Sequence, residues 1–168
     1  VVGSAQAIQR IASTTGKDIQ GFAATVTITD GAIVNAAASL GGGAVARQEI
    51  SSINANKVTA SSVYAQIHSV INAGMGVAGE GDATQLISVI GGGTVNNSKV
   101  IVNADAIVNA SLAVGASSQA TQRVGDVEAS SGSINDVTDR VTIGAAENIS
   151  AELAGGGVAT QNIGTVDG

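Results

Sequence analysis

The chain has no cysteine and no proline, and only 1% of its 168 residues are aromatic. Without cysteine, neither a disulfide framework nor a thiolate metal site can form. Without large aromatic side chains, a hydrophobic core must be thin and built from alanine, valine, isoleucine and a few leucines. Proline cannot donate a hydrogen bond to a β-ladder, so its absence suits a chain whose strands are paired on both sides.

Charge is also scarce, with 13 acidic and 7 basic residues and a formal net charge of -6. The basic residues are scattered, so the chain lacks the basic stripe of nucleic-acid-binding proteins, and we expect no nucleic-acid partner. The uncharged, apolar-looking run of residues 31–46 has 16 residues and includes four glycines. Such a run is too short and too polar to span a bilayer, so we expect no membrane insertion.

A short phrase, Ala-x-Gln-x-(Ile/Val), organises the sequence because it occurs five times at a nearly constant interval. Its glutamines are spaced by 39, 37, 37 and 39 residues, and a period in this range indicates stacked structural repeats. The units of this single array are residues 1–39, 40–76, 77–113 and 114–152, followed by a partial unit, 153–168. The five glutamines are Gln9, Gln48, Gln85, Gln122 and Gln161.

A second phrase, (Ile/Val)-(Ile/Val)-Asn-Ala, follows the same period. The asparagines of this column are Asn35, Asn72, Asn109 and, two residues late, Asn148. Four valines also lie 37 residues apart, namely Val26, Val63, Val100 and Val137. We therefore expect one two-residue insertion between Val137 and Asn148 and another between Gln9 and Val26. Insertions in repeat arrays map to loops, so both should lie in turns.

Repeats of this length can be pairs of helices or turns of a β-solenoid. Residues 25–29 and 100–102 are rich in β-branched side chains, which favour strands. Glycine-rich breaks at 41–43, 91–93 and 155–157 leave little room for helices, although the alanine-rich residues 32–40 are a helical candidate. The sequence therefore predicts an all-β fold, a β-solenoid of about four and a half repeats with stacked, cross-β-like rungs.

In a β-solenoid, equivalent side chains of successive turns stack about 4.8 Å apart. The glutamine and asparagine columns would then form amide ladders inside the fold, because an unpaired buried amide costs about 1–3 kcal/mol. The alternative is that these amides face solvent. Two apolar columns should fill the core, and they are Ile11, Ile50, Ile87, Val124 and Ile163, and Leu40, Val77, Val114 and Leu153.

No constellation in the sequence points to catalysis, a cofactor or a metal site. The single histidine, His68, has no counterpart in the other units and is interpreted as a surface or turn residue. Residues 79–82 are similar to a calcium-binding glycine–aspartate frame, but they occur once, whereas such frames repeat. Asp136 and Asp139 lie beside Arg140 and are interpreted as a solvated turn. We therefore expect a protein that is not an enzyme.

The period of 37, the recurrent glutamine and asparagine, the abundant glycine and alanine, and the absence of proline and cysteine together resemble the repeats of bacterial functional amyloid subunits. Fap-type subunits are the nearest in pattern and curli-type subunits are more distant, and residues 96–122 match best. The resemblance implies a secreted subunit that polymerises into an extracellular filament for biofilm formation or surface attachment. Its partner would be itself, with extracellular matrix components as further partners.

Neither end of the array contains a sequence typical of a polar capping unit, and open strand edges are templates for pairing with another chain. We therefore predict head-to-tail stacking, in which the partial unit starts a rung that the next copy completes. The residues assigned to this tail are Leu153, Val158, Gln161, Ile163 and Val166.

Two other functions stay open. The repeat could be a passive stalk within a larger secreted adhesin, or a β-helix enzyme that acts on polysaccharides. The enzyme would need a cleft of acidic, basic and aromatic residues, which the sequence does not indicate. The chain begins with Val1 rather than methionine, which suggests either removal of a signal peptide or a piece of a longer protein.

Overall fold

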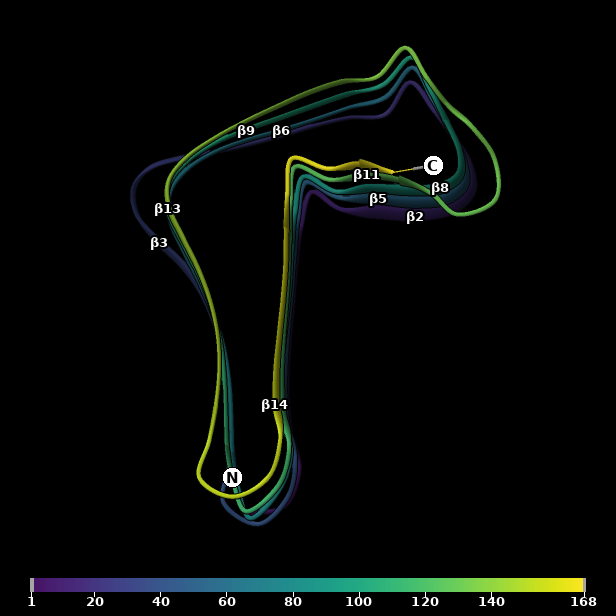
Figure 1. Cartoon of the computed structure of the whole chain (residues 1–168). Helices are drawn as coiled ribbons and strands as arrows, with labels where there is room; N and C mark the ends of the chain where they lie inside the picture. Colours follow the sequence, from purple (N-terminus) through teal and green to yellow (C-terminus); the bar gives the residue numbers. More distant parts are fainter. Residues whose placement is uncertain (1, 168) are drawn as a thin grey trace.

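The computed structural model describes residues 2–167, and in this range every regular element is a β-strand. Val1 and Gly168, the first and last residues of the predicted array, lie outside the described residues. Viewed along the stack, the turns lie on one another and share an L-shaped outline with two arms (Figure 1). Each repeat forms one turn, so the predicted β-solenoid is confirmed, and the helical candidate at 32–40 lies almost wholly in a strand.

Three parallel sheets run along the stack, and we name them A, B and C in the order in which the chain visits them. Sheet A contains β1 (Ala5–Ile11), β4 (Ala44–Ile50), β7 (Gly81–Ile87), β10 (Ser118–Val124) and β14 (Gly157–Ile163). Sheet B contains β2 (Thr14–Gln20), β5 (Ile53–Thr59), β8 (Ile90–Asn96), β11 (Val127–Ala129), β12 (Ile134–Asn135) and β15 (Val166–Asp167). Sheet C contains the long strands β3 (Ala23–Ser39), β6 (Ser62–Val77), β9 (Lys99–Val114) and β13 (Thr138–Glu152).

The two arms are packed differently. In the wide arm, the first half of sheet C faces sheet B across a core of isoleucine and valine that includes Ile53, Ile90 and Val100. In the thin arm, the second half of sheet C faces sheet A across alanine, serine and glycine. A Cβ atom added to Gly81 would overlap the carbonyl oxygen of Leu112, so the two sheets approach as closely as glycine permits.

Left-handed residues recur at the same corners of every turn. The bend from sheet A to sheet B has φ between 50° and 59° at Ala12, Ser51, Ser88, Gly125 and Gly164. The bend from sheet B to sheet C repeats this conformation at Gly21, Ala60, Asn97 and Asp136. Non-glycine residues adopt this conformation at a cost of about 1–2 kcal/mol, which the surrounding ladders must offset.

The extra residues of the first turn lie inside β3, so the predicted site between Gln9 and Val26 is wrong. The pairing offset is 39 up to Ile28 and Ile67, and it becomes 37 from Ala32 and Ser69 onward. Residues 29–31 therefore bulge outward, where β3 leaves the outline shared by the other turns (Figure 1). An even insertion keeps the inward and outward alternation of side chains, which lets a strand absorb it.

The extra residues of the fourth turn lie between β11 and β12, so the predicted site after Val137 is also wrong. β11 pairs with β8 at an offset of 37 and β12 pairs with β8 at 39, which places the insertion at 130–133. Asp139, not Val137, consequently stacks on Val100. Val137 lies 37 residues after Val100, and this spacing predicts that the two valines stack. A shift of two residues keeps a side chain on the same face of a strand, so the spacing does not reveal the insertion that precedes Val137.

Two further expectations fail. Residues 91–93 lie within β8 and are not a break between elements. The column assigned to Leu40 and Leu153 does not fill the core, because these side chains are 63% and 82% exposed. The column of Ile50, Ile87 and Val124 is fully buried, as predicted.

Candidate functional site

The five predicted glutamines form one continuous ladder along sheet A. Each Nε2 donates to the Oε1 of the glutamine one turn nearer the N-terminus, at 2.7, 2.9, 2.8 and 2.5 Å. Gln48, Gln85 and Gln122 are completely buried. The Nε2 atoms of Gln85 and Gln122 also lie within hydrogen-bonding distance of backbone carbonyls of sheet C.

The four predicted asparagines form a second ladder, on sheet C, with the opposite polarity. Each Nδ2 donates to the Oδ1 of the asparagine one turn nearer the C-terminus, at 2.9, 2.9 and 2.8 Å. Each Nδ2 also lies near two backbone carbonyls of sheet A, which for Asn72 are those of Ala46 and Thr84. The two antiparallel ladders therefore join sheets A and C across the thin arm, where the apolar contact is small.

The N-terminal end of the stack exposes an unpaired strand edge. The N–H of Ala5 donates to Gly43 and the carbonyl of Ile11 accepts from Ser51, so these groups point toward the second turn. Because backbone groups alternate along a strand, those of Gln6, Ile8 and Arg10 point toward the open end. Among the described residues, the Nε2 of Gln9 has no ladder acceptor on that side.

The C-terminal end exposes a different set of edges. In the fifth turn, β14 pairs with β10 and β15 pairs with β11, but within residues 2–167 no strand follows β13 on sheet C. As a result, β14 is exposed along its whole length, and the predicted tail residues Leu153, Val158, Gln161, Ile163 and Val166 are all exposed. The Oε1 of Gln161 faces the open end as an acceptor without a ladder donor in the described chain.

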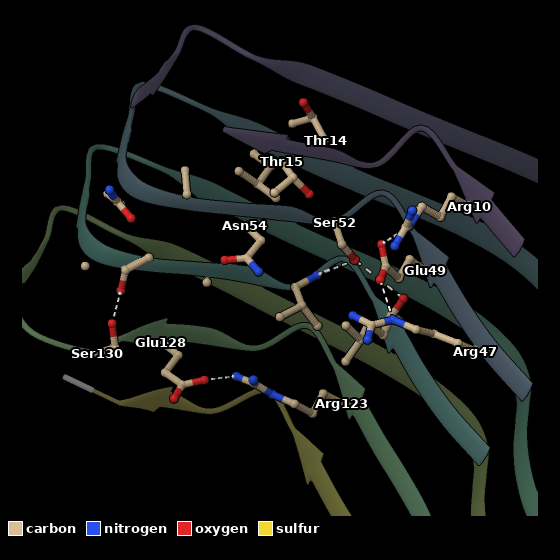
Figure 2. A pocket seen from close by; sticks show the side chains of 18 of the residues that line it. Arg10, Thr14, Thr15, Arg47, Glu49, Ser52, Asn54, Arg123, Glu128 and Ser130 are labelled. Atoms are coloured by element: carbon tan, nitrogen blue, oxygen red, sulfur yellow. Dashed lines mark hydrogen bonds and ion pairs between the residues drawn. The ribbon is translucent and has the colours of Figure 1, made fainter. Parts of the chain in front are cut away.

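A groove of about 740 Å³ runs along the stack in the inner angle of the L, between the outer faces of sheets A and B. Its sides carry arginines and carboxylates together with hydroxyl and amide groups such as Thr15 and Asn54 (Figure 2). The sequence interpretation missed this cluster, because its members come from three turns and lie far apart in the sequence. The one available signal was that Arg10 and Glu49 are separated by one repeat.

The charges of the groove are neutralised within it. Glu49 accepts from Arg10 at 3.0 Å and from Arg47 at 2.6 Å. Arg123 binds the buried carboxylate of Asp126 at 2.5 Å. It also binds the carboxylate of Glu128 at 2.7 Å (Figure 2). Neither Phe22 nor Tyr64 lines the groove. Each arginine and carboxylate that lines the groove is therefore already paired, and the groove offers hydrogen-bonding groups to a polar ligand.

The remaining titratable candidates lie apart from the groove. His68 is exposed on sheet C, and its Nδ1 lies within hydrogen-bonding distance of the Oδ2 of Asp105, at 2.8 Å, in agreement with a surface position. Asp139 is not in a solvated turn but in β13, where burial, and then the carboxylate of Asp126, raise its pKa to about 6. Within residues 2–167, no group of three or more histidine and carboxylate side chains is placed to hold a metal ion.

These features define the chain as a β-solenoid repeat protein with internal glutamine and asparagine ladders. No family model, no curated protein and no solved structure matches it. In the described part of the chain, no helix has the length and apolar character needed to cross a membrane.

Proposed function

We propose that this chain is a structural subunit that polymerises head-to-tail into an extracellular, functional-amyloid-like filament used in biofilm or surface attachment. The observation on which this depends is that both ends of the stack expose unpaired parallel strand edges, those of β1, β2 and β3 at one end and those of β13, β14 and β15 at the other. Such edges are templates for strand addition, and a heterologous contact that does not close produces a filament.

The two ends are chemically complementary. In the glutamine ladder every Nε2 points toward the N-terminal end, so Gln9 offers a donor there and Gln161 offers an acceptor at the other end. A second copy stacked with its β1 on β14 would continue the ladder in the same polarity. A head-to-head contact would place donor against donor. The ladder therefore favours one direction of growth.

Exposed apolar side chains at both ends add a driving force. Val2 and Ile8 are 87% and 57% exposed at the N-terminal end, and Val158 and Val166 are 58% and 53% exposed at the C-terminal end. Burying an aliphatic side chain stabilises a contact by about 1.5–3 kcal/mol when its exposure is fully lost. Stacking would cover these residues together with the backbone edges.

The experiment that tests polymerisation is a proline substitution on the open edge, Ile8→Pro. The N–H of Ile8 points away from the second turn, so its loss leaves the hydrogen bonds of the monomer intact, and proline is tolerated at such edge positions. We expect the unmodified chain to form filaments in electron micrographs and Ile8→Pro to remain as discrete particles in sedimentation. The matched control, Ile8→Ala, removes the same side chain but keeps the N–H, and it should still polymerise.

Discrete particles of the unmodified chain at high concentration would reject the proposed function. Equal loss of filaments in Ile8→Ala and Ile8→Pro would show that the side chain, not the strand edge, makes the contact. Circular dichroism of each variant should retain the β-spectrum, which separates blocked assembly from unfolding.

The proposed role of the tail has a test of its own. Within the described residues, the fifth turn adds strands to sheets A and B but none to sheet C. If a second copy stacks on β14, sheet C therefore has one empty strand position, between β13 of the first copy and β3 of the second copy. Deletion of residues 155–168 should abolish filaments if the tail seats the next copy. Faster growth after deletion would instead identify the tail as a cap that the second copy displaces, and would reject the seating role while keeping polymerisation.

A further inference from the structure

The outer face of the second half of sheet C is apolar and free of charge over the first three turns. Along each strand, the residues that alternate with those of this face are buried, so the side chains of this face point outward, away from the ladders. The side chains stack in columns in the observed register. We call this surface the apolar face, and its columns are Val34, Ile71 and Val108; Ala36, Ala73 and Ala110; Ala38, Met75 and Leu112; and Val77 with Val114.

The columns form ridges and a groove that run along the stack. The valine and isoleucine column is one ridge, the Met75 and Leu112 column is another, and the alanine column between them is a shallow groove. Val34, Met75 and Leu112 are 55%, 43% and 37% exposed. Two such faces can interdigitate, with a ridge of one copy in the alanine groove of the other, as paired sheets do at a spacing of about 10 Å.

The outer faces of the other sheets do not share this character. The corresponding surface of sheet A carries Arg47, Glu49 and Arg123, and that of sheet B carries Asn54 and Glu128 in the polar groove. Among the described outer faces, the apolar face is therefore the single candidate for a contact between copies that needs a dry, uncharged surface.

The area of the apolar face sets a condition on its use. Seven residues at about 3.3 Å and three turns at about 4.8 Å give a rectangle of roughly 330 Å² per chain. A stable interface needs about 800 Å² per partner. Three chains stacked end to end would supply roughly 1,000 Å² by the same estimate. The face is too small to pair single chains firmly, and it becomes sufficient once stacking has lengthened it.

From these observations we propose that the apolar face pairs with the same face of a second solenoid, so that each filament consists of two laterally joined stacks. The occupant is another copy of this chain, because only a surface with the same repeat can match the ridges along the whole length. This inference rests on the proposed end-to-end polymerisation, and it adds a second, lateral contact made by different residues.

The fourth turn interrupts the face and limits the pairing. In register above Val108, Ala110 and Leu112 lie Glu147, Ile149 and Ala151. Glu147 adds a charge to the ridge, and Ile149, which is 46% exposed, fills the alanine groove. Two stacks that run in the same direction without stagger would place Glu147 opposite Glu147. Antiparallel stacks avoid this contact between like charges, so the lateral contact should relate antiparallel stacks.

The test is Ala73→Glu, which places a charge in the centre of the alanine groove. The Ala73 side chain points outward, so the monomer can keep the carboxylate in solvent. The matched control is Thr84→Glu, which adds the same charge to the outer face of sheet A. The readout is mass per length of the filaments in scanning transmission electron microscopy. We expect two chains per cross-section in the unmodified protein and in Thr84→Glu, and one in Ala73→Glu.

A single chain per cross-section in the unmodified filament would overturn the proposal, as would an unchanged doubled mass in Ala73→Glu or an equal loss in Thr84→Glu. Removing the charge with Glu147→Ala should raise the proportion of paired filaments. If the unmodified chain forms no filaments, polymerisation itself fails. The proposal of paired filaments then fails with it, whereas filaments with one chain per cross-section would reject the lateral contact alone.

Discussion

Truncation of one ladder asparagine, Asn72→Ala, should destabilise the fold far more than the same truncation at the end of the column, Asn148→Ala. Asn72 is completely buried, and its Nδ2 donates to the Oδ1 of Asn109 at 2.9 Å. Its Oδ1 in turn accepts from Asn35 at 2.9 Å. Asn148 lies beside the open fifth turn and is only partly buried.

The expected magnitude follows from the groups left without partners. In Asn72→Ala the buried Oδ1 of Asn109 loses its donor, which costs about 1–3 kcal/mol. The small cavity adds roughly 1 kcal/mol. Asn35 loses one acceptor but keeps the carbonyls of Ala7 and Arg47. The total is about 2–4 kcal/mol. For Asn148→Ala water can replace the lost group, so the cost should be about 1 kcal/mol or less.

The measurement is the free energy of unfolding from urea titration followed by circular dichroism. Both substitutions are made in the Ile8→Pro background, which should keep the chain discrete. The double variant with Asn109→Ala adds a coupling test, because the two amides share one hydrogen bond and their effects should be non-additive. Equal costs at Asn72 and Asn148, or costs below about 0.5 kcal/mol at both, would refute the claim that the ladder stabilises the thin arm.

Three further changes test other parts of the fold. Ser88→Gly should stabilise the protein by about 1–2 kcal/mol, since Ser88 has φ 50° and a buried hydroxyl without a partner; lower stability in urea titration would contradict this. Gly81→Ala should destabilise by about 1–3 kcal/mol through overlap with sheet C, whereas Gly156→Ala, with no atom within 4 Å of its added Cβ, should be neutral. The pKa of Asp139 is raised to about 6 by burial and by Asp126, so the folded state holds this proton more tightly than the unfolded state. Stability should therefore rise as the pH falls from about 6 to 4 and be lost as the pH rises, by about 1 kcal/mol after solvent screening is allowed for. Asp139→Asn should remove this part of the pH dependence, and an unchanged pH profile would show that the carboxyl group is solvated.

The outward columns illustrate where sequence reasoning failed. A period of 37 correctly placed Val77 above its counterpart Val114, but the period alone does not say which face of the strand the pair occupies. Leu40 was assigned to the core because it is apolar, and it lies instead beside the apolar face. The groove shows the same limit, because Arg10, Glu49 and Arg123 converge only after the chain has turned between sheets A and B.

The length of the repeat and the identity of both amide ladders can be read from the residues alone, although their spacing leaves open whether one repeat makes one turn or two. A side chain that must hydrogen-bond to its own copy in the next turn leaves a periodic trace that can be read without coordinates. The fold was needed to show that each repeat forms one turn, where the two-residue insertions lie, which face each apolar column occupies, and that the turn closes into an L with a thin and a wide arm. An even insertion lengthens the interval between repeats but keeps side-chain parity, so the spacing does not fix its position within the turn. The bend of a strand depends on contacts with a facing sheet, which the spacing does not record.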